Sequence, residues 1–320
     1  MSFLNDGSSY TNPYGNHTVV DMVPEDMLHL IDSHWYGFPP LNDMWYGILA
    51  FFTGTMGVLA VTGNLTVIYV FMTTKALRSP ANYYVVNLAI SDFTLMACMC
   101  PPMLINSYHR TWVFGPFACY VYAGIGSLTG CASIFTMCLI SYDRYNVIVK
   151  GIGGKPLTTG KAMVWIALVW LTSIAWTIAP FFGWSRYVPE GNMTACGTDY
   201  LRHDMVDITY VWAYTAWCYF LPFVFIVFCY WYIVAAVRSH EKAMRDQAKK
   251  MGVKSLRGDA DAQKKSADCT LAKIALINVS LWFMAWTPYA IQNIGGMVNK
   301  PMITPLFTIW GSLFAKANTV

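Results

Sequence analysis

The chain has 320 residues and a formal net charge of +4, and only 12% of its residues are charged, whereas 56% are hydrophobic and 16% aromatic. A water-soluble domain carries charge on about 25% of its residues, so this composition excludes an ordinary soluble globular protein. Lipid must therefore replace water around much of the folded surface.

Seven apolar runs follow one another along the chain. Each has about 18 residues or more, which is enough for an α-helix to cross a hydrocarbon layer ~30 Å thick. A membrane β-barrel would show short alternating segments instead. We therefore predict an all-α bundle of seven transmembrane helices in residues 43–320, preceded by an extracellular tail, residues 1–42. The runs are residues 44–72, 83–105, 120–149, 161–182, 206–237, 271–298 and 303–320.

The basic residues orient this bundle in the membrane. Residues 1–42 contain no Lys or Arg, whereas residues 238–273 contain ten. Positive charge collects on the cytoplasmic side of membrane proteins. The N-terminus is therefore predicted to be extracellular, and residues 238–270 to form a long cytoplasmic loop. Asn16 begins a glycosylation sequon in the predicted extracellular tail, and Asn192 begins another in an extracellular loop.

Two of the nine cysteines, Cys119 and Cys196, lie at the predicted extracellular rim, where oxidation is permitted. We expect a disulfide bond between them, which would hold the loop between the fourth and fifth helices against the third helix. The other seven lie in helices or on the cytoplasmic side, where small apolar packing is the expected role. No metal site is expected.

Ionisable residues inside the predicted helices are few, and each is costly in a membrane. More than three residues from the helix ends, they are Asp92, Asp143, Arg144 and Lys316. Lys316 lies about 13 residues into the last run, which places it ~20 Å from the outer rim. Position alone leaves two interpretations open. The lysine is paired with a buried carboxylate, or its amine has condensed with an aldehyde to form a Schiff base.

The charge of a modified Lys316 would need a partner, and beyond their first turns the outer halves of the predicted helices contain no carboxylate. Glu190, in the loop that Cys196 would tie down, is the best candidate counter-ion, acting through water. The hydroxyl of Tyr122, one turn below Cys119, would face the same space, but a neutral phenol cannot balance charge. Aromatic residues are dense in this region: Trp286, Tyr289, Tyr214, Tyr219, Trp310 and Phe314.

The sequence also indicates a movable inner end. Pro288 follows a tryptophan by two residues and would bend the sixth helix by removing a backbone hydrogen bond. Asp143-Arg144-Tyr145 ends the third helix, and Asp268 is expected to open the sixth. A salt bridge from Arg144 to Asp268 would close the inner mouth, although contact with lipid headgroups is an alternative for any arginine at this depth.

Together these residues resemble the rhodopsin-like family of G-protein-coupled receptors over nearly the whole chain. Within that family, residues 183–191 look like the second extracellular loop of opsins, and residues 314–316 look like the retinal attachment site. The resemblance implies a photoreceptor rather than an enzyme, with 11-cis-retinal on Lys316 as a protonated Schiff base and Glu190 as counter-ion. The motifs that carry it are residues 87–92, Asp143-Arg144-Tyr145, Trp170, Pro222 and Trp286-Thr287-Pro288.

The resemblance further implies a retinal pocket beside the third helix. Gly126 and Gly130 would leave room there for a polyene, although close helix packing is also an ordinary role for glycine. Pro288 would be the pivot of the activating movement. The expected pocket residues are Tyr122, Gly126, Ser127, Gly130, Trp286, Tyr289 and Ser312.

The subgroup and the partners are implied by other positions. Vertebrate visual opsins carry a carboxylate where this chain has Tyr122, and residues 146–151 and 247–251 look like arthropod visual pigments, with an arachnid opsin as the nearest expected type. Such a pigment implies a Gq-type G protein, arrestin, a microvillar plasma membrane and a light-reversible photoproduct. The lipid bilayer is the other expected partner, and no nucleic acid is expected.

Three other functions share parts of this pattern. A light-driven ion pump would need carboxylates near Lys316, and the helices offer only Asp92 and Asp143, both toward the inner side. A receptor for a diffusible ligand would leave Lys316 unexplained. A retinal photoisomerase would share Lys316 but would have less need of the Asp143-Arg144-Tyr145 motif.

Overall fold

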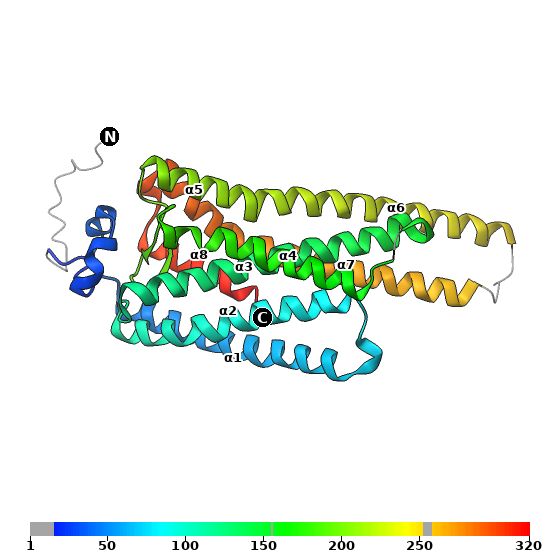
Figure 1. Ribbon diagram of the computed structural model, residues 1–320, viewed down its shortest axis with the longest axis horizontal. Helices are drawn as coiled ribbons and strands as arrows, with labels where there is room; N and C mark the ends of the chain where they lie inside the picture. Colours follow the sequence, from blue (N-terminus) through cyan, green and yellow to red (C-terminus); the bar gives the residue numbers. More distant parts are fainter. Residues whose placement is uncertain (1–15, 155, 252–257) are drawn as a thin grey trace.

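The computed structural model describes residues 16–154, 156–251 and 258–320, and for residues 152, 240–251 and 258–269 it describes the backbone alone. Long helices run side by side, and residues 16–42 pack with a short hairpin against one end of the bundle (Figure 1). We call this the outer end. The end at which α6 and α7 extend beyond the other helices is the inner end.

Eight α-helices make up the described part of the bundle. Six spans are long and apolar enough to cross a membrane, and the π-helical turn η7 (Ala216–Phe220) joins two of the helices, α5 and α6, into one of these spans. The helices are α1 (Asp43–Thr73), α2 (Asn82–His109), α3 (Gly115–Tyr145), α4 (Thr159–Thr177), α5 (Met205–Thr215), α6 (Leu221–Met251), α7 (Gly258–Val298) and α8 (Pro305–Ala317). The seventh apolar run is thus helical over 13 residues, fewer than the full run expected for residues 303–320.

Side-chain caps explain where several of these helices begin. The Asn42 side chain accepts the backbone N–H of Met44 at 2.9 Å, which satisfies a donor that the first helical turn leaves free. Thr304 caps α8 in the same way, and Pro305 follows at the first helical position, where its missing N–H costs nothing.

The inner end differs from the prediction of a long loop over residues 238–270. The backbone stays helical to Met251 and is helical again from Gly258, so both helices continue beyond the bundle (Figure 1). The prediction that Asp268 opens the sixth helix is wrong, since α7 begins ten residues before it. Polar sequence did not end the helices here, because a helix can satisfy its own backbone in water as well as in lipid.

Buried polar side chains cross-link the middle of the bundle. The Trp170 indole N–H donates to Asn87 Oδ1 at 2.9 Å, and the Asn87 amide donates to Thr136 Oγ1 at 2.8 Å, which joins α4, α2 and α3. Ser133 donates to Asp92 at 2.9 Å. Groups left unpaired in lipid would cost several kcal/mol, so these bonds fix how the helices face one another.

A hairpin covers the outer end of the bundle. Strands β1 (Tyr187–Glu190) and β2 (Ala195–Thr198) pair antiparallel, with Glu190 opposite Ala195. A disulfide joins Cys119 on α3 to Cys196 on β2. The hairpin therefore lies fixed across the top of α3, which is where the candidate counter-ion was expected.

The two sequons lie in different environments. Asn16 is exposed. Asn192 lies in the turn between β1 and β2 with only 4% of its surface accessible, and its side chain accepts a hydrogen bond from Thr194 at 3.0 Å. A glycan has no room on Asn192 in this fold, so Asn16 is the better acceptor of the two.

Candidate functional site

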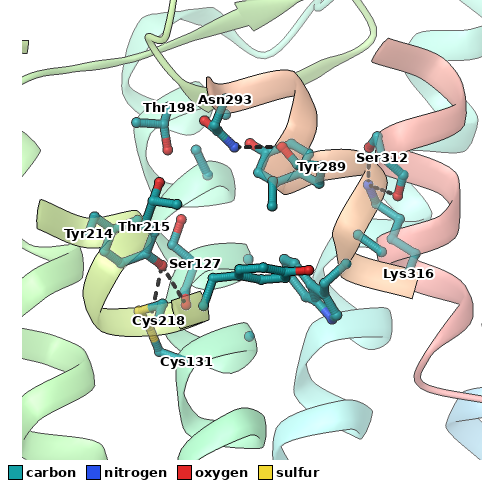
Figure 2. Close-up of a pocket in the computed structure, with 18 of the residues that line it drawn as sticks. Ser127, Cys131, Thr198, Tyr214, Thr215, Cys218, Tyr289, Asn293, Ser312 and Lys316 are labelled. Atoms are coloured by element: carbon teal, nitrogen blue, oxygen red, sulfur yellow. Dashed lines mark hydrogen bonds between the residues drawn. A yellow bond between two sulfur atoms is a disulfide. The ribbon is translucent and has the colours of Figure 1, made fainter. Parts of the chain in front are cut away.

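A cavity of about 110 Å³ lies inside the outer half of the bundle, beneath the hairpin. Lys316 and Ser312 bound it on one side, and Tyr214, Thr215 and Cys218 lie across from them (Figure 2). The cavity is thus bounded by α8 on one side and by α5 and η7 on the other. The sequence-predicted residues that line it are Gly126, Ser127, Gly130, Glu190, Trp286, Tyr289, Ser312 and Lys316.

Tyr122 is not among the residues that line this cavity. Its ring packs edge-on against Trp112 at 5.1 Å, and its hydroxyl is buried with no hydrogen-bond partner among the described residues. The expectation that Tyr122 is a residue of this pocket is therefore corrected. The aromatic contact of Tyr122, which spacing does not predict, holds the ring beside the cavity rather than against it.

The Lys316 amine is buried, with 5% of the residue accessible, and lines the cavity. Its Nζ donates to Ser312 Oγ at 2.6 Å and to the Ser312 backbone carbonyl at 3.4 Å, both one turn earlier on α8 (Figure 2). In the described part of the chain it forms no ion pair within 4.0 Å. Of the two interpretations left open by its position, the structure thus does not show a lysine paired with a buried carboxylate among the described residues.

Glu190, the last residue of β1, points its carboxyl group into the protein with only 6% of the residue accessible. Its Oε1 accepts from Tyr289 Oη at 3.2 Å and from Gln292 Nε2 at 3.3 Å. Burial raises the pKa of Glu190 to about 8, while the Lys316 charge and the Tyr289 hydrogen bond pull it down. Gly197 makes room for the carboxyl group, since a Cβ there would lie 2.4 Å from Glu190 Cδ.

The raised pKa of Glu190 predicts a pH-dependent stability of the retinal-free protein. The folded state binds this proton more tightly than the unfolded state, whose pKa is near 4.5, so the contribution is complete below that pH and is lost as the pH rises through about 8. Glu190→Gln carries no charge at any pH. At about pH 9 we expect the variant to be more stable than the parent by roughly 3–5 kcal/mol, an advantage that vanishes at about pH 4.

Thermal denaturation of the retinal-free protein across this pH range measures the effect. Glu25→Gln, which neutralises an exposed carboxylate on the 3-10 helix η1 (Glu25–Leu30), is the matched control and should follow the parent. Parallel curves for the parent and Glu190→Gln would contradict the buried, proton-binding carboxyl group.

The two glycines of α3 accommodate neighbouring side chains. A Cβ on Gly130 would lie 2.7 Å from Cη2 of Trp286, and a Cβ on Gly126 would lie 2.9 Å from Cε of Met99. The space expected for a polyene is therefore taken at these two points by an indole ring and a thioether. Any larger residue at position 130 would push Trp286 along the cavity.

Aromatic packing around the cavity is only partly as expected. Trp286 stacks on Trp282 with ring centroids 5.4 Å apart, and its other edge meets Tyr289 at 6.2 Å. Trp310 and Phe314 were expected in the same space, but they lie on the outer side of α8 and are 38% and 49% exposed. Only the face of α8 that carries Lys316 borders the cavity. The helical repeat places Trp310 and Phe314 on another face of the same helix, away from the cavity.

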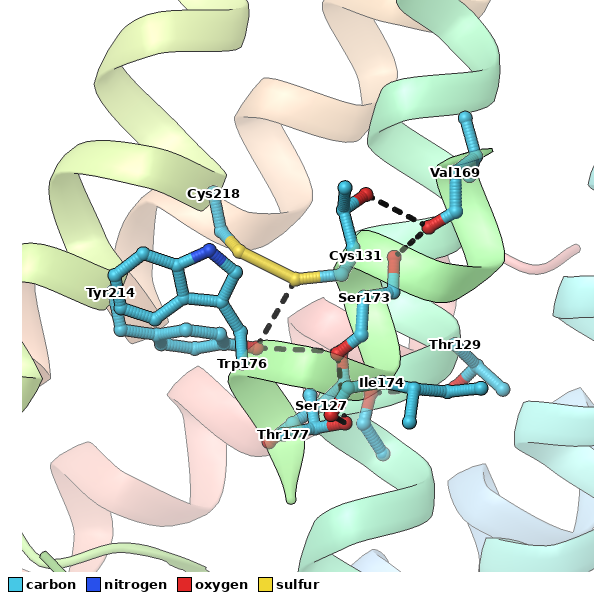
Figure 3. Close-up of a disulfide and its surroundings, with 12 residues drawn as sticks. Ser127, Thr129, Cys131, Val169, Ser173, Ile174, Trp176, Thr177, Tyr214 and Cys218 are labelled. Carbon is cyan, nitrogen blue, oxygen red and sulfur yellow. Dashed lines mark hydrogen bonds between the residues drawn. A yellow bond between two sulfur atoms is a disulfide. The ribbon is translucent and has the colours of Figure 1, made fainter. Parts of the chain in front are cut away.

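A second disulfide, which sequence reasoning missed, borders the same cavity. It joins Cys131 on α3 to Cys218 in η7 (Figure 3). The Tyr214 hydroxyl lies 3.4 Å from Cys131 Sγ and donates to the Ser127 carbonyl at 3.3 Å. Both cysteines were assigned to apolar packing because they lie within membrane runs, so that assignment is corrected.

At the inner end, Arg144 pairs with its neighbour in sequence. Its Nε donates to Asp143 Oδ2 at 3.2 Å, and both side chains are largely buried. The Tyr145 ring stacks on Tyr142, and Lys150 Nζ lies 5.5 Å above the Tyr145 ring. The side chain of Asp268 lies outside the described residues, so its predicted bridge to Arg144 stays a prediction.

The cavity suits an apolar aldehyde such as retinal. Lys316 supplies a buried amine at one side, and Glu190 supplies a carboxyl group within the same lining. The remaining surface is mostly apolar and aromatic, which fits a long hydrocarbon chain and excludes water from the amine. Among the described residues, no group of three or more His, Cys, Asp or Glu side chains is placed to bind a metal.

Comparison with known proteins gives consistent results. The family model described as 7 transmembrane receptor (rhodopsin family) matches residues 63–320. The long-wavelength rhodopsin of Apis mellifera is 58% identical over 96% of this chain and 81% of its own length. A rhodopsin of Procambarus clarkii is 57% identical over 98% of this chain and 83% of its own length. The crystal structure of squid rhodopsin superposes with a TM-score of 0.83 at 38% identity, covering 90% of this chain and 83% of the squid chain.

Proposed function

Because the chain belongs to the rhodopsin family of seven-transmembrane receptors, we propose that it senses light through retinal held on Lys316 and balanced by Glu190. The chain is a multi-pass, light-activated visual receptor that uses retinal and a G protein, and it is not an enzyme. The observation that carries the proposed site is the Lys316 amine, which lines an apolar cavity that Glu190 also borders and has no ion pair in the described structure.

Lys316 and Glu190 have complementary parts in this proposal. Retinal bound to the Lys316 amine in its 11-cis form supplies a light-driven change of shape and carries one positive charge. Glu190 balances that charge from the hairpin, with its Oε1 held by Tyr289. The fixed position of β2 on α3 through Cys119 and Cys196 keeps the carboxyl group over the cavity.

Trp286 and Pro288 pass the change of shape to the inner end. Trp286 fills the space next to Gly130, so pressure on its ring cannot be relieved toward α3 and moves α7 instead. Pro288 lacks the N–H that would stiffen α7 at this level. The hydroxyl groups of Tyr219 and Thr287 lie 2.6 Å apart, which couples η7 to α7 next to the proline. Movement of α7 then opens the inner end around Arg144.

The finer assignments follow from the same sequence stretches. We assign the G protein to the Gq class, expect arrestin to bind the active form, and place the receptor in the microvillar membrane of photoreceptor cells, with an arachnid as its source. Asn16 is the proposed glycosylation site. Because Tyr122 stands where vertebrate visual opsins have a carboxylate, Glu190 would be the counter-ion, and the Lys316 nitrogen would stay protonated after illumination. We therefore expect a second colour of light to reverse the change.

Nucleotide exchange on purified G proteins tests this function. After incubation with 11-cis-retinal, illumination should increase exchange on a Gq-class heterotrimer at least about tenfold over the dark sample, and a second colour of light should return it to the dark rate. The reason is that light biases a two-state element that only the active form presents to the G protein.

Each other outcome of this assay has a definite meaning. Exchange on a different G-protein class alone would retain the receptor and reject the Gq assignment. Normal photochemistry without exchange on any class would favour the retinal photoisomerase. Bleaching to free retinal after one flash would reject the reversible photoproduct.

A further inference from the structure

Gln292 is a fully buried amide at the outer end of α7, with 0% of its surface accessible. Its Nε2 donates to Glu190 Oε1 at 3.3 Å and to the Tyr200 hydroxyl at 2.8 Å. One side chain thus connects α7, the end of β1 and the segment that follows β2. A buried amide costs free energy unless its polar atoms find partners, so packing alone does not explain a glutamine here.

The surrounding glycines clear space for each member of this cluster. A Cβ on Gly311 of α8 would lie 2.6 Å from Gln292 Oε1. A Cβ on Gly296 would lie 2.4 Å from the Tyr200 ring, and one on Gly197 would lie 2.4 Å from Glu190 Cδ. Glycines on three separate elements therefore leave the space that the side chains of Gln292, Tyr200 and Glu190 occupy.

The contacts of Glu190 favour its ionised form. The hydroxyl of Tyr289 and the amide of Gln292 both act as donors to the same oxygen, and a carboxylate only accepts. The Gln292 oxygen has no hydrogen-bond partner among the described residues, so the amide is used solely as a donor. Burial opposes ionisation and raises the pKa of Glu190 to about 8. Removing the Gln292 donor would disfavour the ionised carboxylate further and raise the pKa of Glu190 again.

The other groups that face Glu190 do not replace this donor. Lys316 on α8 acts through its charge, and Tyr289 already donates to the same oxygen. Asp199 repels the carboxylate but is paired with Arg186 at 2.7 Å. Tyr200 donates a hydrogen bond that favours the ionised form, and its own hydroxyl is held by Gln292. On α3, Tyr122 senses the Glu190 charge without donating to it.

We propose that Gln292 is a positioning residue that keeps Glu190 ionised and aimed at the cavity, and that it thereby sets the colour of the pigment and its upper pH limit. The inference rests on the proposed role of Glu190 as counter-ion. A carboxylate stabilises the positive charge at Lys316 most strongly in the dark state, before light moves that charge away. Loss of the carboxylate charge therefore shifts absorption to longer wavelength and lets the proton at Lys316 leave at lower pH.

The substitution Gln292→Met keeps the length of the side chain and removes both donors. In the retinal-free protein at about pH 9, where the parent carboxyl group is mostly ionised, we expect the infrared band of a protonated carboxyl group to grow, and a band that Glu190→Gln abolishes would identify it as Glu190. In the pigment we expect absorption at longer wavelength and loss of the visible band about one pH unit lower than in the parent. Gln292→Asn, which keeps the amide but shortens its reach, should shift both in the same direction by less.

Two controls separate this role from a structural one. Asn106→Leu removes another buried amide, which holds the same hairpin through the Thr194 carbonyl at 3.0 Å without touching Glu190. It should lower the thermal midpoint and leave colour and pH limit unchanged. Adding Gln292→Met to Glu190→Gln should change neither property further, because the carboxylate on which Gln292 acts is gone.

The results divide cleanly. If Gln292→Met and Gln292→Asn lower only the thermal midpoint while Glu190→Gln shifts colour and pH limit, the inference fails and the counter-ion stands. The inference also fails if the Gln292→Met shift persists in the Glu190→Gln background. If Glu190→Gln itself shifts neither property, the proposed counter-ion fails, and the role of Gln292 fails with it.

Discussion

Lys316→Ala is expected to abolish the visible absorption band that 11-cis-retinal gives with the parent protein. Lys316 is the only amine among the residues that line the cavity, and its Nζ is held toward Ser312 at 2.6 Å within that lining. Alanine removes the nitrogen that bonds the aldehyde, and no other lysine among the residues that line the cavity can take its place. Absorption spectra of the two purified proteins after incubation with 11-cis-retinal measure the effect, which should be complete.

The matched control is Lys300→Ala. Lys300 lies at the outer end and pairs with Asp32 at 3.4 Å, so its loss removes a lysine without touching the cavity. It should form the same band as the parent. A visible band in Lys316→Ala would place the attachment elsewhere. A well-folded parent with no visible band would point instead to a receptor for a diffusible ligand.

The bundle and its central chemistry were predictable because a membrane penalises polar groups so heavily. Long apolar runs have few alternatives to helices in lipid, which is why the helix count followed from hydropathy. A lysine within the last run had to be paired, neutralised or modified. Beyond their first turns, the outer halves of the predicted helices contain no carboxylate, which left Glu190 as the candidate anion, and the structure places it in the lining of the same cavity.

The parts that sequence did not predict depend on helix rotation and depth. Cys131 and Cys218 are separated by 87 residues and meet only because η7 turns Cys218 toward α3. A π-helical turn shifts the phase of every later residue by about one position, and no periodicity in the run indicates it. Gln292 was overlooked because it carries no charge, although an amide one turn after Tyr289 in an apolar run is itself a signal.

Breaking the Cys119–Cys196 bond is the second change with a large expected effect. The bond closes a separation of 77 residues, and its loss should cost about 2–5 kcal/mol of folding stability. It also frees β2 from α3, and with it the partner strand that ends in Glu190. Cys119→Ser together with Cys196→Ser should therefore lower the thermal midpoint and sharply reduce the yield of pigment.

The same measurements on two other variants identify what this bond does. Cys98→Ser changes an exposed free cysteine and should match the parent. Cys131→Ser together with Cys218→Ser removes a bond between helices that the bundle already packs together, with Tyr214 still donating to the Ser127 carbonyl. We expect this variant to fold and to form pigment in high yield. If it fails as badly as the Cys119 variant, the bond between α3 and η7 is as necessary to the receptor as the one that holds the hairpin. If the Cys119 variant forms pigment normally, then the N-terminal segment and the contacts of Tyr289 and Gln292 suffice to keep Glu190 in place.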